Sequence, residues 1–486
     1  MLRWKCGKCN LTWIYPVKRC IHCKGDIVKD VTSKMKVIGI TKVTIPSTMH
    51  PIVPYNVLLL EDENGNRLPR KTMKDHSIGD YYIEEKAQSD GAVSIVKIKY
   101  DIYHAVEHSL ELINFDVQED SKILIKPSII FPAYPYQAVN TNPKIVDVVI
   151  KFLVNKNVKP ENITVAEQSP YGIDTVAAAA KAGVLNVCRE NKVNVLDLAK
   201  TEFEEKSIDG YKFKISKEVL DKDIIINLPV LKTHSQFGIA GALENMIRVT
   251  DSETQKAIHK RDVYEKLAYL NKLLKYVTIG DGTIGMHGTG PLLIGEPAFL
   301  NLILASRDAI ALDRVFCEIG CFEIPDYMKV SGNIGVGKTD LKEIEIVGNE
   351  VDAVKYPLNP SSKNPSPHSS VNVIDGLAWS GDYAAMYSVL SKLADIKTNG
   401  INIAIGRVFK KSDLQDKENI VAFGDDSIER LNEIGIKTIA KIDGNPPDLI
   451  ESALLLKKIL EGNGDLKISI LDKMKSKIAS KIAGIR

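Results

Sequence analysis

The sequence predicts an α/β protein built from several domains, and three observations lead to this prediction. Two Cys-x-x-Cys pairs stand within the first 23 residues. Short β-type segments separated by polar turns follow them, up to about residue 100. Beyond that point apolar strands alternate with helical segments, which is typical of a mostly parallel sheet with helices on both faces. A chain of 486 residues has room for roughly three domains of ordinary size.

Residues 1–34 are predicted to form a small zinc module. Cys6 and Cys9 make the first pair, Cys20 and Cys23 make the second, and ten residues separate the pairs. Thiolates at this spacing can converge on one tetrahedral Zn²⁺, as in a zinc ribbon, and four sulfur ligands leave no open position on the metal. The zinc is therefore expected to be structural. A redox pair or a disulfide is the alternative interpretation.

Residues 35–100 are predicted to form a small β-barrel. The segments at 35–46, 53–61, 81–84 and 92–99 have β-type composition, and Asn64-Gly65 is a hairpin signal between two of them. Several short strands joined by turns favour a barrel. We expect this domain to end near Tyr100.

Residues 101–355 are expected to form the main α/β domain. Its expected strands span residues 122–126, 162–167, 193–198, 223–229, 277–281 and 299–305. Its expected helices span residues 144–155, 174–191, 262–275 and 308–319. Because strands and helices alternate, the sheet should be mostly parallel, with its functional loops at the carboxyl ends of the strands.

A smaller α/β lobe is expected at residues 371–465, after a linker at 356–370 that is rich in Pro, Ser and Asn. The lobe's expected helices span 382–394, 427–434 and 447–460, and its expected strands span 401–405, 420–423 and 437–442. Residues 466–486 form a basic amphipathic tail. Packing of this tail on the protein itself or on a sister subunit is favoured over binding to a membrane surface.

Composition excludes several classes of function. The formal net charge is only +2, so the overall field does not favour nucleic acid as a partner. No stretch is long and apolar enough to span a bilayer, and a signal-peptide pattern is absent. Seven cysteines, an odd number with four assigned to metal, fit a reducing cytoplasm.

The first candidate site follows the buried strand that ends near Asn227. Lys232 offers an anion anchor or, when desolvated, a nucleophile or base, and His234 offers a proton shuttle or a metal ligand. Asn245 can orient a carbonyl or a carboxylate, so these three are candidate catalytic residues. The alternative is that Lys232 is solvated and His234 only hydrogen-bonds its own loop. The residues expected to contact substrate here are Asn227, Gly238 and Gly241.

The second candidate site is a glycine-rich segment after the strand expected at 277–281. Five glycines in eleven residues can expose several backbone N–H groups to an anionic ligand. The segment is not a Walker loop, because no Gly-Lys-Ser/Thr follows, and it does not open a dinucleotide fingerprint. Asp281 and His287 are candidates for metal binding or proton exchange, and Gly288 and Gly290 for substrate contact. A flexible turn is the alternative.

The N-terminal part resembles a known family. The resemblance rests on the four cysteines with Pro16, on the strand at 37–43, on the segment at 54–62 and on the turn at 78–80. Together they resemble the zinc-ribbon and OB-fold proteins catalogued as domain of unknown function 35. The resemblance implies an OB-type barrel and an accessory role beside a thiolase-like enzyme, in which the module helps to hold acyl-CoA.

The main domain resembles a second family, catalogued as domain of unknown function 362, over residues of about 101 to 350. Some relatives carry a ferredoxin-like iron–sulfur module that is missing here, and Glu244 stands where a lysine is common. Both departures argue against electron transfer. The matching segments are Ile125-Lys126-Pro127, residues 140–143, 227–229 and 231–234, Asn245-Met246, Asp281-Gly282 with its glycines, residues 305–308, and Leu312-Asp313.

Two hypotheses for function follow. In the first, the protein is an enzyme or enzyme subunit acting on a small anionic or acyl-thioester (coenzyme A type) substrate. Lys126 and Lys232 would bind the anion, His234 or His287 would move protons, and Asp281 would hold a second metal ion. In the second, the protein is a non-catalytic scaffold whose head recruits a thiolase-like enzyme. One loop also distantly resembles nickel-cofactor lactate racemases, and a homo-oligomer is compatible with either hypothesis.

Overall fold

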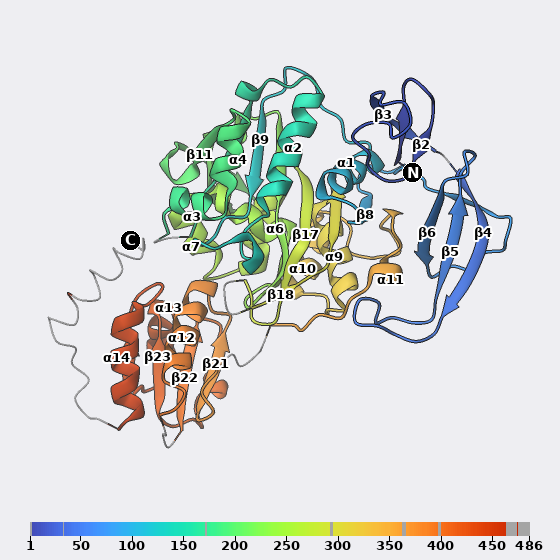
Figure 1. Ribbon diagram of the computed structural model, residues 1–486. Helices are drawn as coiled ribbons and strands as arrows, with labels where there is room; N and C mark the ends of the chain where they lie inside the picture. Colours follow the sequence, from blue (N-terminus) through green and yellow to red (C-terminus); the bar gives the residue numbers. More distant parts are fainter. Residues whose placement is uncertain are drawn as a thin grey trace.

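The computed structural model describes residues 2–32, 34–170, 173–291, 295–361, 366–396, 400–462 and 474. Four parts follow one another along the chain: a cysteine-bearing head, a small antiparallel sheet, a large α/β body and a C-terminal α/β lobe (Figure 1). None of the helices in the described ranges combines the length and the apolar composition that a membrane span requires. The tail expected at 466–486 lies outside the described residues, apart from Met474.

The head is a three-stranded antiparallel sheet in the order β2-β1-β3. Trp4 and Trp13 face each other across β1 and β2, and both are buried. The Arg3 guanidinium contacts Asp62 at 3.2 Å and Glu63 at 2.6 Å, which ties the head to the small sheet. The strands are β1 (Leu2–Cys6), β2 (Thr12–Trp13) and β3 (Ile27–Val31).

The small sheet has the antiparallel order β6-β5-β4-β7. Buried residues alternate with half-buried or exposed ones along strand β5, as expected for a sheet with one face packed on a core. That core contains Met35, Val37, Leu58 and Leu60. The strands are β4 (Lys34–Val43), β5 (Tyr55–Glu61), β6 (Arg67–Thr72) and β7 (Tyr81–Ile83).

The strand expected at 92–99 does not belong to this small sheet, contrary to the predicted boundary at Tyr100. It is β8 (Val93–Lys97), which pairs with β19 (Leu302–Ser306) and β20 (Ile346–Gly348) in the body. The first four residues of β8 are all buried, which a strand covered on both faces requires and a one-sided sheet does not. The body therefore begins earlier along the chain than the sequence indicated.

The body contains an eleven-stranded sheet whose main path runs β11-β10-β9-β14-β17-β19-β8-β20. Its pairings from β11 to β17 are parallel, whereas β19 pairs antiparallel with both β17 and β8, so the sheet is mixed and only this part of its path matches the expected parallel arrangement. A separate hairpin is formed by β12 (Phe203–Ile208) and β13 (Tyr211–Ser216). The remaining strands of the sheet are β9 (Ile123–Pro127), β10 (Ile163–Glu167), β11 (Asn194–Asp197), β14 (Ile224–Leu228), β15 (Val230–His234), β16 (Gly238–Ala240), β17 (Val277–His287) and β18 (Glu296–Ala298).

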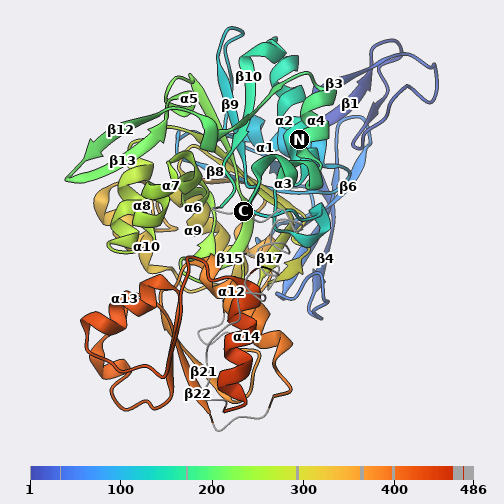
Figure 2. The ribbon, with the colours of Figure 1, turned by 90° about the vertical axis from the view of Figure 1, so that its left-hand side faces the viewer.

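Helices cover both faces of this sheet (Figure 2). One face packs against α1 (Ile102–Leu112), α2 (Pro143–Asn155), α3 (Thr175–Lys181) and α4 (Val184–Glu190). The other face packs against α6 (Ala242–Asn245), α7 (Ser252–Ile258), α8 (Val263–Lys272), α9 (Ala309–Gly320) and α10 (Asp326–Ile334). Short helices also occur at α5 (Lys217–Leu220) and α11 (Val351–Val354).

The single helix expected at 174–191 is two helices, α3 and α4. Gly183 separates them with a φ of +82°, a left-handed conformation that interrupts a right-handed helix. By contrast, the helix expected at 308–319 is observed as the single helix α9, and the Asp308 carboxylate caps its start by accepting the backbone N–H of Ala311.

The C-terminal lobe is a parallel four-stranded sheet in the order β21-β22-β23-β24, with helices packed on it. The lobe lies against the part of the body that holds α7, and a segment of about fifteen residues, 356–370, leads into it (Figure 1). Its elements are β21 (Val371–Gly376), α12 (Ser380–Lys392), β22 (Ile401–Gly406), β23 (Ile420–Phe423), α13 (Asp425–Glu433), β24 (Ala440–Ile442) and α14 (Leu449–Leu460).

One glycine of the body is required by close packing on a buried carboxylate. A Cβ at Gly241 would lie 2.0 Å from Oδ1 of Asp313, a carboxylate that accepts the N–H groups of Ala242 and Leu243 at the start of α6. Asp313 also accepts the hydroxyl of Tyr327 at 3.0 Å, so it has little freedom to move. We infer that Gly241 is needed here for space and not for contact with a substrate.

We expect Gly241→Ala to destabilise the body by about 1–3 kcal/mol, because the added methyl group must displace Asp313 from α6. The measurement is the thermal unfolding midpoint. Gly39→Ala is the control, since a Cβ there would meet only Leu59 at an ordinary 3.5 Å. Equal midpoints for the two variants would contradict the role assigned to Gly241.

Candidate functional site

The four cysteines of the head converge on one point. Their Sγ atoms all lie within 4.8 Å of one another, close enough to hold one metal ion. Cys6 and Cys20 are fully buried, and each sulfur accepts backbone N–H groups, at 3.3 Å from Cys23 to Cys20. The N–H of Cys23 is the main cause that lowers the pKa of Cys20 to about 6, whereas burial and the neighbouring thiols raise the pKa of Cys9 to about 12.

In the body, a buried ion pair joins the ends of two neighbouring strands. Lys126 is the last residue but one of β9, and Glu167 is the last residue of β10. The Lys126 Nζ lies 3.0 Å from both carboxylate oxygens of Glu167. Glu167 also accepts the backbone N–H groups of Ile129 and Gln168, so it holds the loops that follow both strands. Burial raises the pKa of Glu167 and lowers the pKa of Lys126, and their mutual attraction opposes both shifts.

Lys232 lies on β15 and is almost fully buried, so the alternative of a solvated lysine is excluded. Its Nζ donates to the carbonyl of Val139 at 2.8 Å. Burial lowers its pKa to about 8, an effect opposed by the carboxylates of Glu244 and Glu167. Lys232 therefore belongs to the same charged interior as Lys126, although it is not within ion-pair distance of Glu167.

His234, two residues further along β15, is held as a neutral imidazole. Its Nδ1 accepts the backbone N–H groups of Gln236 and Phe237, at 3.0 and 3.2 Å, so the proton resides on Nε2. Nε2 lies 3.8 Å from Glu244. Burial, followed by the charges of Lys232 and Arg248, lowers the pKa of His234 to about 3.

Arg248 was not identified from the sequence, and it completes the cluster of charges. The side chain is buried, its Nη1 donates to Gln255 at 2.9 Å, and its Nε has no hydrogen-bond partner among the described residues. Burial lowers the pKa of Arg248, while Glu244 and Glu167 raise it, so these groups lie within electrostatic reach. Three cations, Lys126, Lys232 and Arg248, thus share the interior with the carboxylates of Glu167, Glu244 and Asp281, the last within electrostatic reach of Lys232.

His259 was also missed, and it lies where the body meets the lobe. Nε2 of Gln236 donates to the carbonyl of His259 at 3.2 Å and to the carbonyl of Leu377, in the lobe, at 2.8 Å. Because the amide nitrogen of Gln236 is used in this way, its Oε1 faces the His259 ring and accepts the N–H of Nδ1. That arrangement leaves a lone pair on Nε2, which has no partner among the described residues. Burial, then the charge of Arg248, lowers the pKa of His259 to about 3.

Arg248 and His259 line a small cavity of about 20 Å³, which has room for about one water molecule. Trp379, Asp426 and Asn445 of the lobe form its opposite wall. The cavity is therefore a body–lobe junction, and neither part encloses it alone. No local sequence pattern reveals it, because its two walls are more than 100 residues apart in the chain.

The two asparagines of the first candidate site pair with each other and with backbone. Nδ2 of Asn245 donates to Oδ1 of Asn227 at 2.7 Å, and Nδ2 of Asn227 donates to the carbonyl of Ala242 at 2.8 Å. These bonds fasten α6 to β14. Gly238 has a φ of +79° and packs against Pro325. These residues shape the loop that carries Lys232 and His234.

The glycine-rich segment is mostly a strand, which corrects the prediction of an anion-binding loop. Residues 280–287 belong to β17, which runs beside β15, with Val230 opposite Asp281. A Cβ at Gly285 would lie 2.5 Å from the carbonyl oxygen of Leu231, and one at Gly290 would lie 2.3 Å from that of Thr233. The glycines therefore allow close approach of two backbones.

The other candidates in this segment lie apart from the charged cluster or are already bonded. Asp281 accepts the N–H of Asn142 at 2.7 Å and both the N–H and the hydroxyl of Thr283, so its oxygens hold a loop in place. His287 accepts the N–H of Asn359 and lies 3.7 Å from Glu296. Gly288 bonds the same linker through its N–H, at 2.7 Å from the carbonyl of Asn359.

Comparisons with known proteins give matches to parts of this chain. Residues 123–318 match the model of a family described as "Domain of unknown function (DUF362)". A thylakoid-associated protein of Synechocystis sp. is 24% identical over 210 residues, which are 42% of this chain. The match spans 64% of that relative, just under two thirds of its length.

Three solved structures show weak likeness. A lactate racemase apoprotein from Thermoanaerobacterium thermosaccharolyticum is 12% identical, with 84% of this chain and 96% of that chain covered and a TM-score of 0.34. A Thermotoga maritima protein is 13% identical over 49% and 60% of the chains, with a TM-score of 0.29. An aldolase described as Ltp2-ChsH2(DUF35) is 21% identical over 18% and 76%, with a TM-score of 0.16. Scores this low assign neither fold nor function.

The part of the chain that matches the family model contains the charged cluster. Lys126, Glu167, Lys232, His234 and Arg248 all fall between residues 123 and 318, whereas the lobe that closes the cavity lies beyond the match. The body of this protein thus carries a domain similar to a family of unknown function, combined with a cysteine-bearing head and a C-terminal lobe.

Proposed function

We propose that the body–lobe junction is the active site of an enzyme that acts on a small anionic substrate. The observation that carries the proposal is the buried guanidinium of Arg248, whose Nε has no hydrogen-bond partner among the described residues and which lines a small cavity. An uncompensated charge in a protein interior is costly, and a bound anion would offset that cost. The small cavity favours a small anion over a coenzyme A thioester.

Arg248 and His259 are the groups that would meet the substrate. The unpartnered Nε of Arg248 can donate a charge-assisted hydrogen bond to an anionic oxygen. The lone pair on Nε2 of His259 can accept a proton, because its other ring nitrogen is occupied by Gln236. A bound anion would raise the low pKa of His259 toward the range in which an imidazole is an effective base.

Three further residues would act on the substrate indirectly, through the electrostatic field of the buried charged side chains and through the loops that they hold in place. They are Lys126, Lys232 and His234. Their polar atoms are bonded to Glu167, to Val139 and to the loop at 236–237, respectively. We therefore assign the three as positioning residues, in place of the direct roles expected from the sequence.

Substrate entry requires the lobe to move, because the cavity holds only about one water molecule when closed. Among the described residues, the polar contacts across the junction include Gln236 to Leu377, Lys260 to Asp426 at 3.1 Å, and Arg261 to Glu433 at 3.8 Å, and an opening movement would have to break them. The lobe would thus serve as a cover that closes over bound substrate and excludes water.

For the head, we propose a structural zinc ion on Cys6, Cys9, Cys20 and Cys23. Four thiolates in one group are the donor set of structural zinc sites, and they leave no position for a substrate. Recruitment of a thiolase-like partner by the head, the accessory role expected from the sequence, remains a separate proposal that a co-purifying enzyme would support.

We expect Arg248→Met to weaken binding of a small carboxylate or inorganic phosphate at least about tenfold, since a charge-assisted hydrogen bond is lost. The measurement is calorimetric titration of the full chain with a panel of small mono- and dicarboxylates and with phosphate. Arg314→Met is the matched control, because this largely buried arginine pairs with Glu318 on α9, outside the cavity.

Unchanged anion binding in Arg248→Met would contradict the assignment of the site. If none of the anions binds to the wild-type chain, the enzyme proposal fails and the scaffold hypothesis gains support.

We expect the stability of the body to fall as the pH drops below about 6.5. The folded-state pKa values of His234 and His259 are about 3, whereas an unfolded histidine titrates near 6.5. Between these values the unfolded chain binds protons that the folded chain does not, so each residue costs about 1.4 kcal/mol of stability per pH unit. The thermal midpoint of His259→Gln should therefore decline less steeply than that of the wild type as the pH is lowered from about 6.5 to about 4.5. His22→Gln, at an exposed position, is the control, and identical slopes for wild type and His259→Gln would refute the neutral imidazole.

We expect Cys20→Ser to lose bound zinc and to loosen the head, while the body stays folded, because a structural metal supplies folding energy only to the unit that binds it. Elemental analysis with native mass spectrometry measures the metal, and limited proteolysis reports on each part. Cys321→Ser, at an exposed cysteine outside the head, should retain the metal. Unfolding of the body in Cys20→Ser would show that the two parts depend on each other.

A further inference from the structure

The cavity at the body–lobe junction has walls of opposite charge. The charged residues that line it from the body are Arg248 and Lys256, and the one that lines it from the lobe is Asp426. In the described part of the chain no ion pair joins Arg248 to Asp426, so the cavity keeps these two charges apart.

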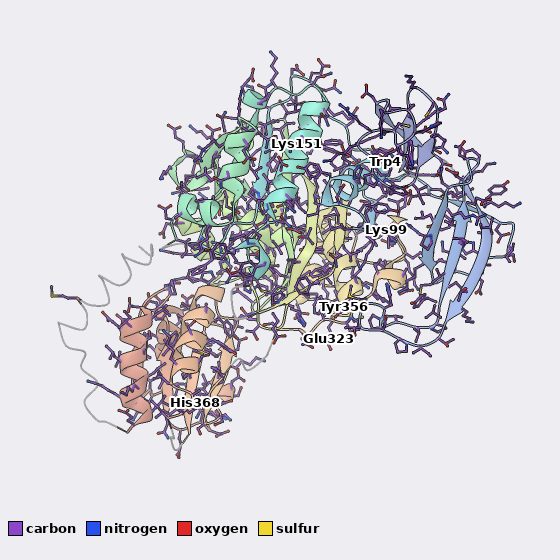
Figure 3. All side chains as sticks on the ribbon, in the orientation of Figure 1. Trp4, Lys99, Lys151, Glu323, Tyr356 and His368 are labelled. Atoms are coloured by element: carbon purple, nitrogen blue, oxygen red, sulfur yellow. The ribbon has the colours of Figure 1, made fainter. Side chains whose placement is uncertain are left out.

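The acidic wall stands at the carboxyl ends of the lobe's parallel strands. Figure 3 labels His368, which comes shortly before β21, on the side of the lobe turned away from the body, so the strands run toward the junction. Strand β23 ends at Phe423, and α13 begins with Asp425 and Asp426. In open α/β sheets, ligands bind at this edge, beyond the carboxyl ends of the strands.

A third aspartate adjoins this wall. Asp382, in the first turn of α12, is 1% exposed, and its Oδ1 has no hydrogen-bond partner among the described residues. A Cβ at Gly424, the residue before α13, would lie 3.0 Å from Oδ2 of Asp382, so this carboxyl group packs on the start of α13.

The field at this wall is strongly negative. Burial, and then the charges of Asp426 and Asp425, raise the pKa of Asp382 well above its ordinary value. Lys260 of the body opposes this effect, and its Nζ lies 3.1 Å from Oδ1 of Asp426, but it does not line the cavity. Two carboxylates thus face one ammonium group here, and a cationic group inside the cavity would relieve the same field that makes Asp382 retain a proton.

The wall on the body side requires a different partner. Nε of Arg248 is a donor without an acceptor, and Nε2 of His259 is an acceptor without a donor, within the described residues. A ligand with one negative group would satisfy Arg248 and leave Asp426 without a partner. A ligand with two negative groups would place the second against Asp426, and like charges brought together in this way are rejected.

We propose that the substrate bound at the junction is a small amino acid, with its carboxylate on Arg248 and its ammonium group on Asp426. This inference rests on the proposed function, because it names the substrate class of the same site. The lone pair on Nε2 of His259 faces the same cavity, so it can accept a hydrogen bond from the ammonium group.

The test is calorimetric titration of the full chain, near neutral pH, with matched pairs of ligands that differ only in an ammonium group. The pairs are acetate and glycine, propionate and β-alanine, and butyrate and γ-aminobutyrate, and succinate represents the dicarboxylates. In at least one pair the amino acid should bind at least about tenfold more tightly than its matched acid, because it gains a charge-assisted hydrogen bond. Succinate should bind more weakly than that amino acid.

Variants of the lobe wall locate the preference. Asp426→Asn should weaken the amino acid at least about tenfold and leave the matched acid unchanged or more tightly bound. Asp416→Asn is the matched control, because this exposed aspartate of the lobe does not line the cavity, and it should keep the preference.

Lys260→Met separates the charge of Asp426 from its contact with the body. This variant breaks the same ion pair as Asp426→Asn but keeps the carboxylate, so it should bind the amino acid at least as tightly as the wild type does. Equal weakening of the amino acid by Lys260→Met and Asp426→Asn would overturn the inference, because loss of the contact between lobe and body would then explain both results.

The remaining outcomes distinguish this inference from the proposed function. If simple acids bind as tightly as amino acids and lose affinity in Arg248→Met, the inference is overturned and the anion site stands. Equal weakening of the amino acid and its matched acid by Asp426→Asn would also overturn the inference. If neither class of ligand binds to the wild-type chain, the proposed function fails and the inference fails with it.

Discussion

The contact between Lys126 and Glu167 constrains the whole polar interior of the body. It places a full positive and a full negative charge at the ends of two parallel strands, where both side chains are excluded from water. A buried pair of this kind is stable only while each partner keeps its other bonds, and removing one partner typically costs about 3–5 kcal/mol. Glu167 meets this condition by accepting the N–H groups of Ile129 and Gln168, so the two loops that follow the strands are set by the same carboxylate.

The remaining charges of the interior are arranged around this pair. Lys232 and Arg248 lie within its electrostatic reach, and the carboxylates of Glu244 and Asp281 offset their charge. The two histidines stay neutral because protonation would add a further charge to this interior. Their hydrogen bonds then determine which nitrogen of each ring is available: Nε2–H of His234 faces Glu244, and the lone pair of His259 faces the junction.

Local sequence signals predicted those features that depend on local structure. The spacing of the four cysteines is short, so their convergence could be expected from tight turns alone. The charged residues at strand ends, Lys126 and Lys232, were found because parallel strands gather their carboxyl ends at one edge. The surroundings of these side chains could not be predicted from the local sequence. Lys232 was expected to contact the substrate, yet it is buried and its Nζ donates to the carbonyl of Val139.

Features that depend on distant partners could not be predicted. Glycines 280–290 resembled a loop in composition, but they allow β17 to approach β15, a neighbour that lies some fifty residues earlier in the chain. Arg248 and His259 carry no motif, and their importance arises from Trp379 and Asp426 on a lobe that no pattern connects to them. β8 resembled the strands before it, and only its burial on both faces revealed its place in the body.

The position of β8 has a consequence for what counts as one folding unit. The segment similar to the known family begins at residue 123 and ends at residue 318, yet the sheet it contributes is completed by β8 before it and β20 after it. A piece of chain cut at those limits would leave β19 as a bare edge, with unpaired amide groups open to association with other chains. The head and the small sheet are thus attached to the body through one of its own interior strands, and exchange of such modules between proteins would have to carry that strand with them.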